Sequence, residues 1–382
     1  MERKILLKTK GETQNQIRYV VTEDGEPVFY GVFDPMDVYG ETICSVRIKE
    51  RLTAHKVVFC DVGRDKPAFI NNCNFLPGKM MLVQADSSEH DSKGIKFSTD
   101  IKIRGKYLVA VMHQYSSRCG LEAKISKKIT DYELKNKLFN FISEYPVRRC
   151  IDMDCFCEVI CRTSVAELDD LSILDDDLDM IFAEWNALLH DFSENYKTNA
   201  KVGIIKGYTD VIDYIRKHER TDDFAEIVSD CPILSHNLSE TSPAFADKIK
   251  CMSEKNEFDI FTVYAVDNRL CQLMRKQVYL KSGAYLVIEF TEAMTVIDVN
   301  SGKNTVGNSL AVNKEAAAEI MRQLRLRDIG GIIVCDFINM FDSRKDRELV
   351  LYLKELAGSD TQEIYISNVS HLGLVEIARK RS

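Results

Sequence analysis

The 382-residue sequence predicts a multidomain fold of mixed α+β and α/β class. A strand, helix, strand pattern between residues 283 and 338 predicts an α/β unit near the C-terminus. Closely spaced strand candidates between residues 37 and 115 predict a small β-barrel instead. Residues 1–36 predict a hairpin without a core of its own. They must therefore join strands from later in the chain, which makes the barrel region an insertion.

The composition predicts a globular protein of the cytoplasm. Its 45% hydrophobic and 29% charged residues are ordinary for such proteins. The N-terminal apolar stretch is too short for a signal peptide, and no run approaches the roughly 18 apolar residues of a membrane span. The net charge of −8 argues against a protein that coats nucleic acid indiscriminately, although it leaves room for local basic patches.

The 12 cysteines lack the paired spacing of a disulfide framework, which fits a reducing compartment. The tightest group contains no Cys-x-x-Cys pair, so free thiols buried in a strand explain it better than a zinc site. Its members are Cys150, Cys155, Cys157 and Cys161. Six aspartates between Asp169 and Asp179 predict a solvated loop and helix start.

The hairpin and the barrel come first in the chain. Ile17 to Val21 and Val28 to Val32 flank a Glu-Asp-Gly-Glu-Pro turn. The barrel candidates are residues 43–50, 56–62, 67–70, 79–86 and 94–103. Five such strands suit an OB-fold, which binds oligonucleotides on one face. Phe59 and Phe69 are candidate stacking platforms, because any base can stack on an aromatic ring; the alternative is that both belong to the barrel core.

Residues 116–205 change to mixed helix and strand. Residues 134–142 and 178–189 predict amphipathic helices, with Trp185 in the core. Between them a strand ends on Arg162 and Thr163. A guanidinium can donate two hydrogen bonds to a phosphate, and a threonine hydroxyl adds a third donor. From spacing alone, however, a plain surface arginine is the commoner explanation of this pattern.

Two strand-like segments, residues 284–300 and 331–337, each carry one aspartate near the end, Asp298 and Asp336. Asn313 is a plausible N-cap of the helix between them, and Gly330-Gly331 ends that helix. A crossover of this kind makes the strands parallel, so both aspartates reach one edge of the sheet. Carboxylates in such apolar runs need compensation, and Mg²⁺ supplies it. Phosphodiester cleavage is the first hypothesis; ordinary turn and loop caps are the alternative.

At these residues the sequence resembles the ribonuclease E/G endoribonucleases. The resemblance is carried by Tyr285-Leu-Val-Ile-Glu-Phe-Thr-Glu-Ala-Met-Thr-Val-Ile-Asp-Val-Asn-Ser-Gly302, by Asn313-Lys-Glu-Ala-Ala and by Arg322-Gln-Leu-Arg-Leu-Arg-Asp-Ile-Gly-Gly-Ile-Ile-Val-Cys-Asp-Phe-Ile-Asn-Met340. It spans nearly the whole chain, more loosely between residues 116 and 260.

The resemblance implies a role for each matching residue. Asp298 and Asp336 would bind the catalytic Mg²⁺, and Asn300 would support them. The RNA-binding face of the OB-fold would present Phe59, Phe69 and Lys93. A pocket that senses a 5′-monophosphate would comprise Gly105, Val109, Arg162 and Thr163.

The resemblance also implies five segments. A ribonuclease-H-like subdomain would be split between residues 1–36 and 206–275. Inserted into it would be the OB-fold, residues 37–115, and a 5′-sensor subdomain, residues 116–205. A DNase-I-like catalytic subdomain would follow at residues 276–382.

Three departures from the family stand out. The family has Asp where this chain has Asn339, and Phe where it has Leu372 before Gly373. The Cys-Pro-x-Cys zinc link between subunits is absent before Ser382. A homo-oligomer is therefore not expected to form through a shared zinc ion.

The leading hypothesis is a Mg²⁺-dependent endoribonuclease that cleaves single-stranded RNA and prefers 5′-monophosphorylated ends. Its processes would be mRNA decay or rRNA processing. One alternative is a non-catalytic RNA-binding relative that retains the OB-fold and the sensor. A second is a phosphodiesterase for a small nucleotide; the retained aspartates argue against the first alternative, and the aromatic and sensor residues against the second.

Overall fold

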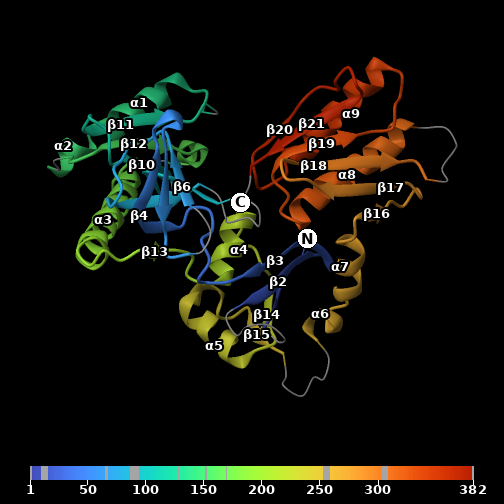
Figure 1. The fold of residues 1–382 in the computed structure, drawn as a ribbon, viewed down its shortest axis with the longest axis horizontal. Helices are drawn as coiled ribbons and strands as arrows, with labels where there is room; N and C mark the ends of the chain where they lie inside the picture. Colours follow the sequence, from blue (N-terminus) through green and yellow to red (C-terminus); the bar gives the residue numbers. More distant parts are fainter. Residues whose placement is uncertain are drawn as a thin grey trace. The chain divides into compact units, whose positions relative to one another are not determined.

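The computed structural model describes residues 2–9, 16–64, 68–86, 94–127, 129–150, 153–168, 170–252, 259–302 and 309–380. The chain divides into two compact units (Figure 1). Met1–Asp37 and Tyr208–Ser382 form the first unit, and Val38–Gly207 the second, which is thus inserted in the first. The predicted mixture of helices with several sheets is confirmed. The finer division into five segments stays a prediction.

A five-stranded sheet, in the order β15-β14-β1-β2-β3, opens the first unit. Its strands are β1 (Arg3–Lys8), β2 (Ile17–Glu23), β3 (Glu26–Phe33), β14 (Glu226–Ser229) and β15 (Ile249–Cys251). The predicted hairpin is confirmed as β2 and β3, and its turn residues Asp24 and Gly25 both have the positive φ that tight hairpin turns require. Because β1 pairs in parallel with β14, the N-terminal strands do join a later part of the chain.

Short helices accompany this sheet: α4 (Val211–Glu219), α5 (Pro232–Thr241), α6 (Ile260–Val263) and α7 (Asp267–Leu273). Isolated turns of 3₁₀ helix occupy Thr53–His55, Thr163–Glu167 and Pro243–Phe245, and a π-helical turn occupies Phe192–Lys197. Among the described residues, no helix combines the length and the hydrophobicity that a membrane crossing needs.

The inserted unit contains a closed five-stranded barrel. Its strands are β4 (Ile43–Leu52), β5 (Val57–Asp61), β6 (Ala68–Asn71), β7 (Met80–Ala85) and β8 (Ile95–Ser98). Pairing of β4 with β7 closes it, and β13 (Gly203–Lys206) adds to the start of β4. The fifth predicted strand, residues 94–103, is wrong as a single element: it splits into β8 of the barrel and β9 of the next sheet.

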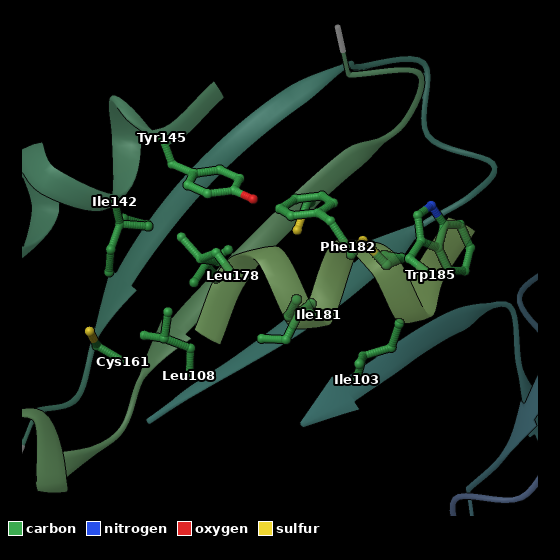
Figure 2. Close-up of a cluster of buried hydrophobic side chains, with 14 of the residues drawn as sticks. Ile103, Leu108, Ile142, Tyr145, Cys161, Leu178, Ile181, Phe182 and Trp185 are labelled. Atoms are coloured by element: carbon green, nitrogen blue, oxygen red, sulfur yellow. The ribbon is translucent and has the colours of Figure 1, made fainter. Parts of the chain in front are cut away.

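That next sheet, β11-β12-β10-β9, comprises β9 (Asp100–Arg104), β10 (Leu108–His113), β11 (Gly120–Ile125) and β12 (Phe156–Cys161). Three helices accompany it: α1 (Tyr132–Ser143), α2 (Tyr145–Arg149) and α3 (Ile173–Asp191). Figure 2 shows apolar side chains of α3 packed toward the sheet residues Ile103 and Leu108. Trp185 is among them and is 5% exposed, so its predicted place in the core is confirmed.

The four cysteines between Cys150 and Cys161 differ in burial. Cys157 and Cys161 lie in the core of this sheet, and burial raises the pKa of each thiol to about 12. Both thiols therefore stay protonated near neutral pH. Cys155 is partly buried and Cys150 is exposed. Within the described ranges, no cluster of three or more metal-ligating side chains forms here or elsewhere.

A six-stranded sheet, β16-β17-β18-β19-β21-β20, completes the first unit. Its strands are β16 (Gln277–Tyr279), β17 (Tyr285–Phe290), β18 (Met294–Asn300), β19 (Gly331–Asp336), β20 (Ile364–Ile366) and β21 (Leu374–Arg379). The helices α8 (Ser309–Leu326) and α9 (Ser343–Ala357) belong with it. The segment 284–300 is not one strand but a hairpin of β17 and β18, whose turn is closed by three hydrogen bonds between Thr291 and Met294.

Candidate functional site

Asp298 and Asp336 are register partners at the ends of two neighbouring parallel strands. β18 and β19 run in parallel, and these two residues form the last pair of the ladder, which places their Cα atoms about 4.8 Å apart. The parallel crossover predicted from the sequence is therefore confirmed. Two carboxylates on one face of one sheet edge repel each other, and a divalent cation between them removes that repulsion.

The two carboxylates are exposed, whereas their chain neighbours point into the core. Ile297, Val299 and Cys335 are buried, and Asp298 and Asp336 face solvent between them. The expectation that these carboxylates sit inside buried strands is therefore wrong. Strand alternation separates the apolar and acidic faces, so no large desolvation cost falls on the aspartates. Exposure also leaves their oxygens accessible to an ion and to a substrate.

Asn300 supports the first aspartate directly. It lies two residues after Asp298 and so on the same face of the strand, and its Nδ2 donates a hydrogen bond to Asp298 Oδ2 at 2.6 Å. The chain then turns at Gly302, which has φ of 61° and whose missing Cβ would collide with the carbonyl oxygen of Gly283. Only glycine fits there, which explains the Asn-Ser-Gly sequence at the end of β18.

Asn313 supports the second aspartate through the backbone. It was expected to cap the helix, and that expectation is wrong: α8 begins at Ser309, and Asn313 is buried in its second turn. Its Nδ2 donates to the carbonyl oxygen of Ile338 at 2.8 Å, and its Oδ1 accepts from the Ile338 amide at 3.1 Å. Because Ile338 lies two residues after Asp336, this paired contact fixes the chain just beyond that aspartate.

We expect Asn313→Ala to lower the free energy of unfolding by about 2–4 kcal/mol, because two partly buried backbone groups of Ile338 lose their partners. Urea denaturation measures this loss. Any metal-dependent activity at this edge should fall as well, since the segment after Asp336 loses its anchor. The matched change Asn368→Ala removes an exposed amide from the same unit and should leave both quantities near wild-type values. Equal unfolding free energies for the two variants would contradict the anchoring role.

The carboxylate pair fits Mg²⁺ in its donor chemistry. Both side chains offer hard oxygen ligands, and the part of the chain that the structure describes contains no group of three or more His, Cys, Asp or Glu side chains that could hold a metal. An ion at this edge therefore depends on two carboxylates, with waters and substrate oxygens for the rest. Magnesium is bound in proteins in this manner, unlike structural zinc, which takes four protein ligands.

Two of the three departures, Asn339 and Leu372, lie close to this edge along the chain. Asn339 is exposed, and its Oδ1 accepts a hydrogen bond from the Phe341 amide at 2.9 Å, which needs no negative charge. Leu372 is 84% exposed and precedes Leu374, the register partner of Asp336 in β21. Neither departure removes a candidate ligand.

Phe59 and Phe69 form a pair on the outside of the barrel. They are register partners in β5 and β6, and both are partly exposed, while Val58 and Ile70 beside them are buried. The alternative that both rings belong to the core is therefore wrong. Two adjacent rings on an open sheet face are a stacking surface for unpaired bases.

One cation beside this pair was missed by the sequence reasoning. Lys96 of β8 is the register partner of Phe69, and its Nζ lies 2.7 Å from an oxygen of Asp86. The signal was present, because strand alternation puts Lys96 on the face opposite to the buried Ile95 and Phe97. Lys93, the lysine expected there, lies outside the described residues.

The structure brings Arg162 next to the turn between β9 and β10. The backbone amide of Arg162 donates to Tyr107 O at 3.1 Å, and its Nη1 donates to Lys106 O at 3.3 Å. Gly105, at the start of that turn, donates to Leu108 O at 2.9 Å. Thr163 is exposed directly after Arg162, and Val109 continues into β10 as the register partner of Arg104. Thr163 is thus the residue after Arg162, and Val109 is the residue after Leu108, which ends the turn.

Asp177 holds this turn in place, and sequence reasoning missed it. Its carboxylate accepts the backbone amides of Lys106, Tyr107 and Leu108 at 2.7, 2.9 and 2.9 Å. A Cβ on Gly105 would collide with that carboxylate, so the close approach of α3 requires glycine there. The predicted solvated acidic run is therefore wrong at Asp177, which is buried. Nothing in the sequence distinguishes it from the aspartates around it.

Comparisons with known proteins find relatives that match most of this chain. Residues 102–382 match the model of the ribonuclease E/G family. The chain is 30% identical to ribonuclease E of Haemophilus influenzae over 318 residues, which cover 80% of this chain and 31% of that protein. It is 31% identical to ribonuclease E of Escherichia coli over 322 residues, covering 80% of this chain and 28% of that protein. To ribonuclease G of Escherichia coli it is 26% identical over 373 residues, covering 88% and 71%. The chain thus spans under a third of the two ribonucleases E and most of ribonuclease G.

Proposed function

Because the chain belongs to the ribonuclease E/G family, we propose that it is a Mg²⁺-dependent endoribonuclease that cleaves single-stranded RNA. The observation that supports this most is the exposed, in-register pair Asp298 and Asp336 at one edge of a sheet. The related proteins are named ribonuclease E and ribonuclease G. We place the activity in the cytoplasm, in mRNA decay or rRNA processing.

The two aspartates would bind the ion, and the two asparagines would orient them. Mg²⁺ held by Asp298 and Asp336 would polarise the scissile phosphate and make a bound water more acidic. Asn300 fixes one oxygen of Asp298 by its hydrogen bond, so the other stays free to act as a ligand. Asn313, through Ile338, fixes the backbone that follows Asp336. Both carboxylates are thereby oriented before the substrate arrives. This preorganisation is what the protein side chains contribute to catalysis.

Circular single-stranded RNA tests this function most cleanly, because it has no ends. We expect the protein to convert circles to linear molecules in Mg²⁺ and to leave them intact in EDTA. A fully duplexed linear RNA of the same length serves as the matched control and should be cleaved far more slowly. Binding without linearisation would favour the non-catalytic RNA-binding alternative. Hydrolysis of dinucleotides alone would favour the small-nucleotide phosphodiesterase.

We assign the barrel as the OB-fold that captures the RNA, on the support of the exposed Phe59 and Phe69 pair. We assign the five-stranded sheet of the first unit to the ribonuclease-H-like subdomain and its six-stranded sheet to the DNase-I-like catalytic subdomain. Capture and cleavage then reside in different units of the chain.

We further propose that Arg162 and Thr163 bind a 5′-monophosphate beside the turn of Gly105 and Val109. The three amides of this turn are already bonded to Asp177, so the guanidinium and the hydroxyl must supply the main donors to the phosphate. Arg162 uses Nη1 on Lys106 O, which holds the guanidinium in place while other N–H groups remain for a ligand.

We expect Arg162→Ala to erase the preference for 5′-monophosphorylated over 5′-hydroxylated RNA without lowering the rate on the hydroxylated substrate. Charge-assisted bonds of about 1.5–3 kcal/mol each disappear with the guanidinium, whereas a 5′-hydroxyl offers no charge to bind. Cleavage rates on the two substrates measure the effect. Arg162→Lys keeps the charge but not the two-pronged geometry and should be intermediate. Equal slowing on both substrates would mean that Arg162 is structural.

A further inference from the structure

The inserted unit contains a pocket that belongs neither to the Phe59 and Phe69 pair nor to the Arg162 turn. Its volume is about 490 Å³, within the range of about 300–1,000 Å³ that small-molecule sites occupy. The loop after β6 forms one wall. The start of β9, the end of β10, the turn between β10 and β11, and the start of β12 form the others.

Aromatic rings line two sides of this pocket. Phe75 and Tyr115 lie with their ring centres 4.8 Å apart, and Lys79 Nζ sits 4.0 and 4.6 Å from those two centres. On the other side, the guanidinium carbon of Arg118 lies 4.1 Å from the centre of Phe156. Tyr115 is 41% exposed, so its ring is available to a ligand. The pocket thus offers flat surfaces with cations close by.

The polar groups of the pocket suit a neutral ligand with donors and acceptors. Asn72 and Asn74 are exposed, and each side-chain amide both donates and accepts. The wall also carries the Asp100 carboxylate, which lies 3.1 Å from His113 Nδ1 and disfavours an anion as the main ligand. On its other side, buried His113 Nε2 makes no hydrogen bond within the described residues and lies 3.8 Å from Glu158 Oε1, so a second carboxylate close by also disfavours an anion.

Hydrogen bonds of Gln114 connect two walls of the pocket. Gln114, next to His113, donates from Nε2 to the carbonyl oxygens of Leu82 in β7 and of Thr99, at 3.3 and 2.9 Å. This contact ties β10 to the barrel, so the shape of the pocket is set before a ligand arrives. A preformed site loses less conformational entropy on binding.

We propose that this pocket binds one unpaired nucleobase, stacked against Tyr115 and Phe75, with its edge read by the amides of Asn72 and Asn74. Recognition of single-stranded RNA uses this combination of stacking and edge hydrogen bonds. The pocket begins directly after β6, the strand that carries Phe69, so an RNA strand on the barrel face leads to it. The inference rests on the proposed action on RNA and adds a base-reading site to it.

An abasic scan tests the inference on the full chain in EDTA, where cleavage is suppressed. A fluorescent A/U-rich oligonucleotide is made as a series, each member lacking one base, and its Kd is measured by anisotropy. In the wild type, loss of one particular base should weaken binding about 5- to 20-fold. That base should differ from those whose loss is felt through Phe59 and Phe69. Tyr115→Ala should weaken the intact oligonucleotide by a similar factor and become insensitive at that position. Tyr132→Ala, an exposed tyrosine of the same unit, should match the wild type.

A second variant and a second ligand complete the test. Asn74→Ala should reduce the difference in Kd between oligonucleotides that carry different bases at the sensitive position. AMP and UMP, titrated separately, show whether a free nucleotide occupies the site. If the wild type binds them, Tyr115→Ala does not, and no abasic position matters, the pocket still binds a base. Its ligand is then a free nucleotide and not a base within an RNA strand.

The inference fails if Tyr115→Ala and Asn74→Ala bind the whole series and both nucleotides as the wild type does, while Phe59→Ala with Phe69→Ala still weakens RNA binding. The proposed function would survive that result. If the wild type binds none of these oligonucleotides, the proposed action on RNA itself fails, and the two failures are thereby distinguished.

Discussion

Asp336→Asn is expected to slow RNA cleavage by about 10³-fold or more, and Asp298→Asn to have a similar effect. Each change removes one of two candidate ligands of the ion, whose electrostatic contribution to the transition state is worth several kcal/mol. Single-turnover cleavage in Mg²⁺ measures the chemical step. RNA affinity should stay nearly unchanged, since the Phe59 and Phe69 pair lies in a different unit of the chain.

The same two variants should lose activity without losing stability. Asp298 and Asp336 are exposed like charges in adjacent register positions, so neutralising one of them relieves repulsion. The melting temperature should be equal to or slightly above that of the wild type. Asp267→Asn makes the same substitution at an exposed site on α7 and should leave the cleavage rate unchanged. Retention of more than about a tenth of the wild-type rate in Asp336→Asn would place the metal elsewhere.

Phe59→Ala combined with Phe69→Ala is expected to weaken binding of single-stranded RNA by about 1–3 kcal/mol for each lost ring. Both rings are partly exposed on the outer face of the barrel, so their removal leaves the buried Val58 and Ile70 in place. The barrel should therefore remain folded. RNA titration and thermal melting on the same sample measure affinity and stability together.

Phe139→Ala is the matched control for this double variant, because it removes an exposed phenylalanine from α1 of the same unit. Its RNA affinity should equal that of the wild type. A double variant that melts far below the wild type would show that the rings stabilise the barrel, and unchanged affinity would exclude them from the RNA-binding face.

The parts of the site that the sequence predicts are those governed by local periodicity. The apolar runs around Asp298 and Asp336, with a helix between them, sufficed to predict parallel strands and a shared edge. Alternation along a strand also decides that Phe59 faces outward once Val58 is assigned to the core. What periodicity could not supply was the choice between core and surface for Phe59 and Phe69, since either face of a barrel strand can be apolar.

The parts that the sequence did not predict depend on contacts between distant segments. Asparagine favours the N-cap of a helix, which predicts a cap at Asn313, yet the Asn313 side chain bonds to Ile338, 25 residues away. Asp177 bonds to a turn about 70 residues earlier, and no local pattern marks it among its acidic neighbours. The hairpin turn at Thr291 was missed because the family motif runs through it without glycine or proline.

We propose above all that Asp298 and Asp336 together hold one divalent ion. Electron paramagnetic resonance counts bound Mn²⁺, which accepts the same oxygen ligands as Mg²⁺. The measurement compares the wild type with the double variant Asp298→Asn, Asp336→Asn, at Mn²⁺ concentrations that support cleavage. We expect the double variant to bind one ion fewer per chain. Equal numbers of bound ions in the two proteins would contradict it.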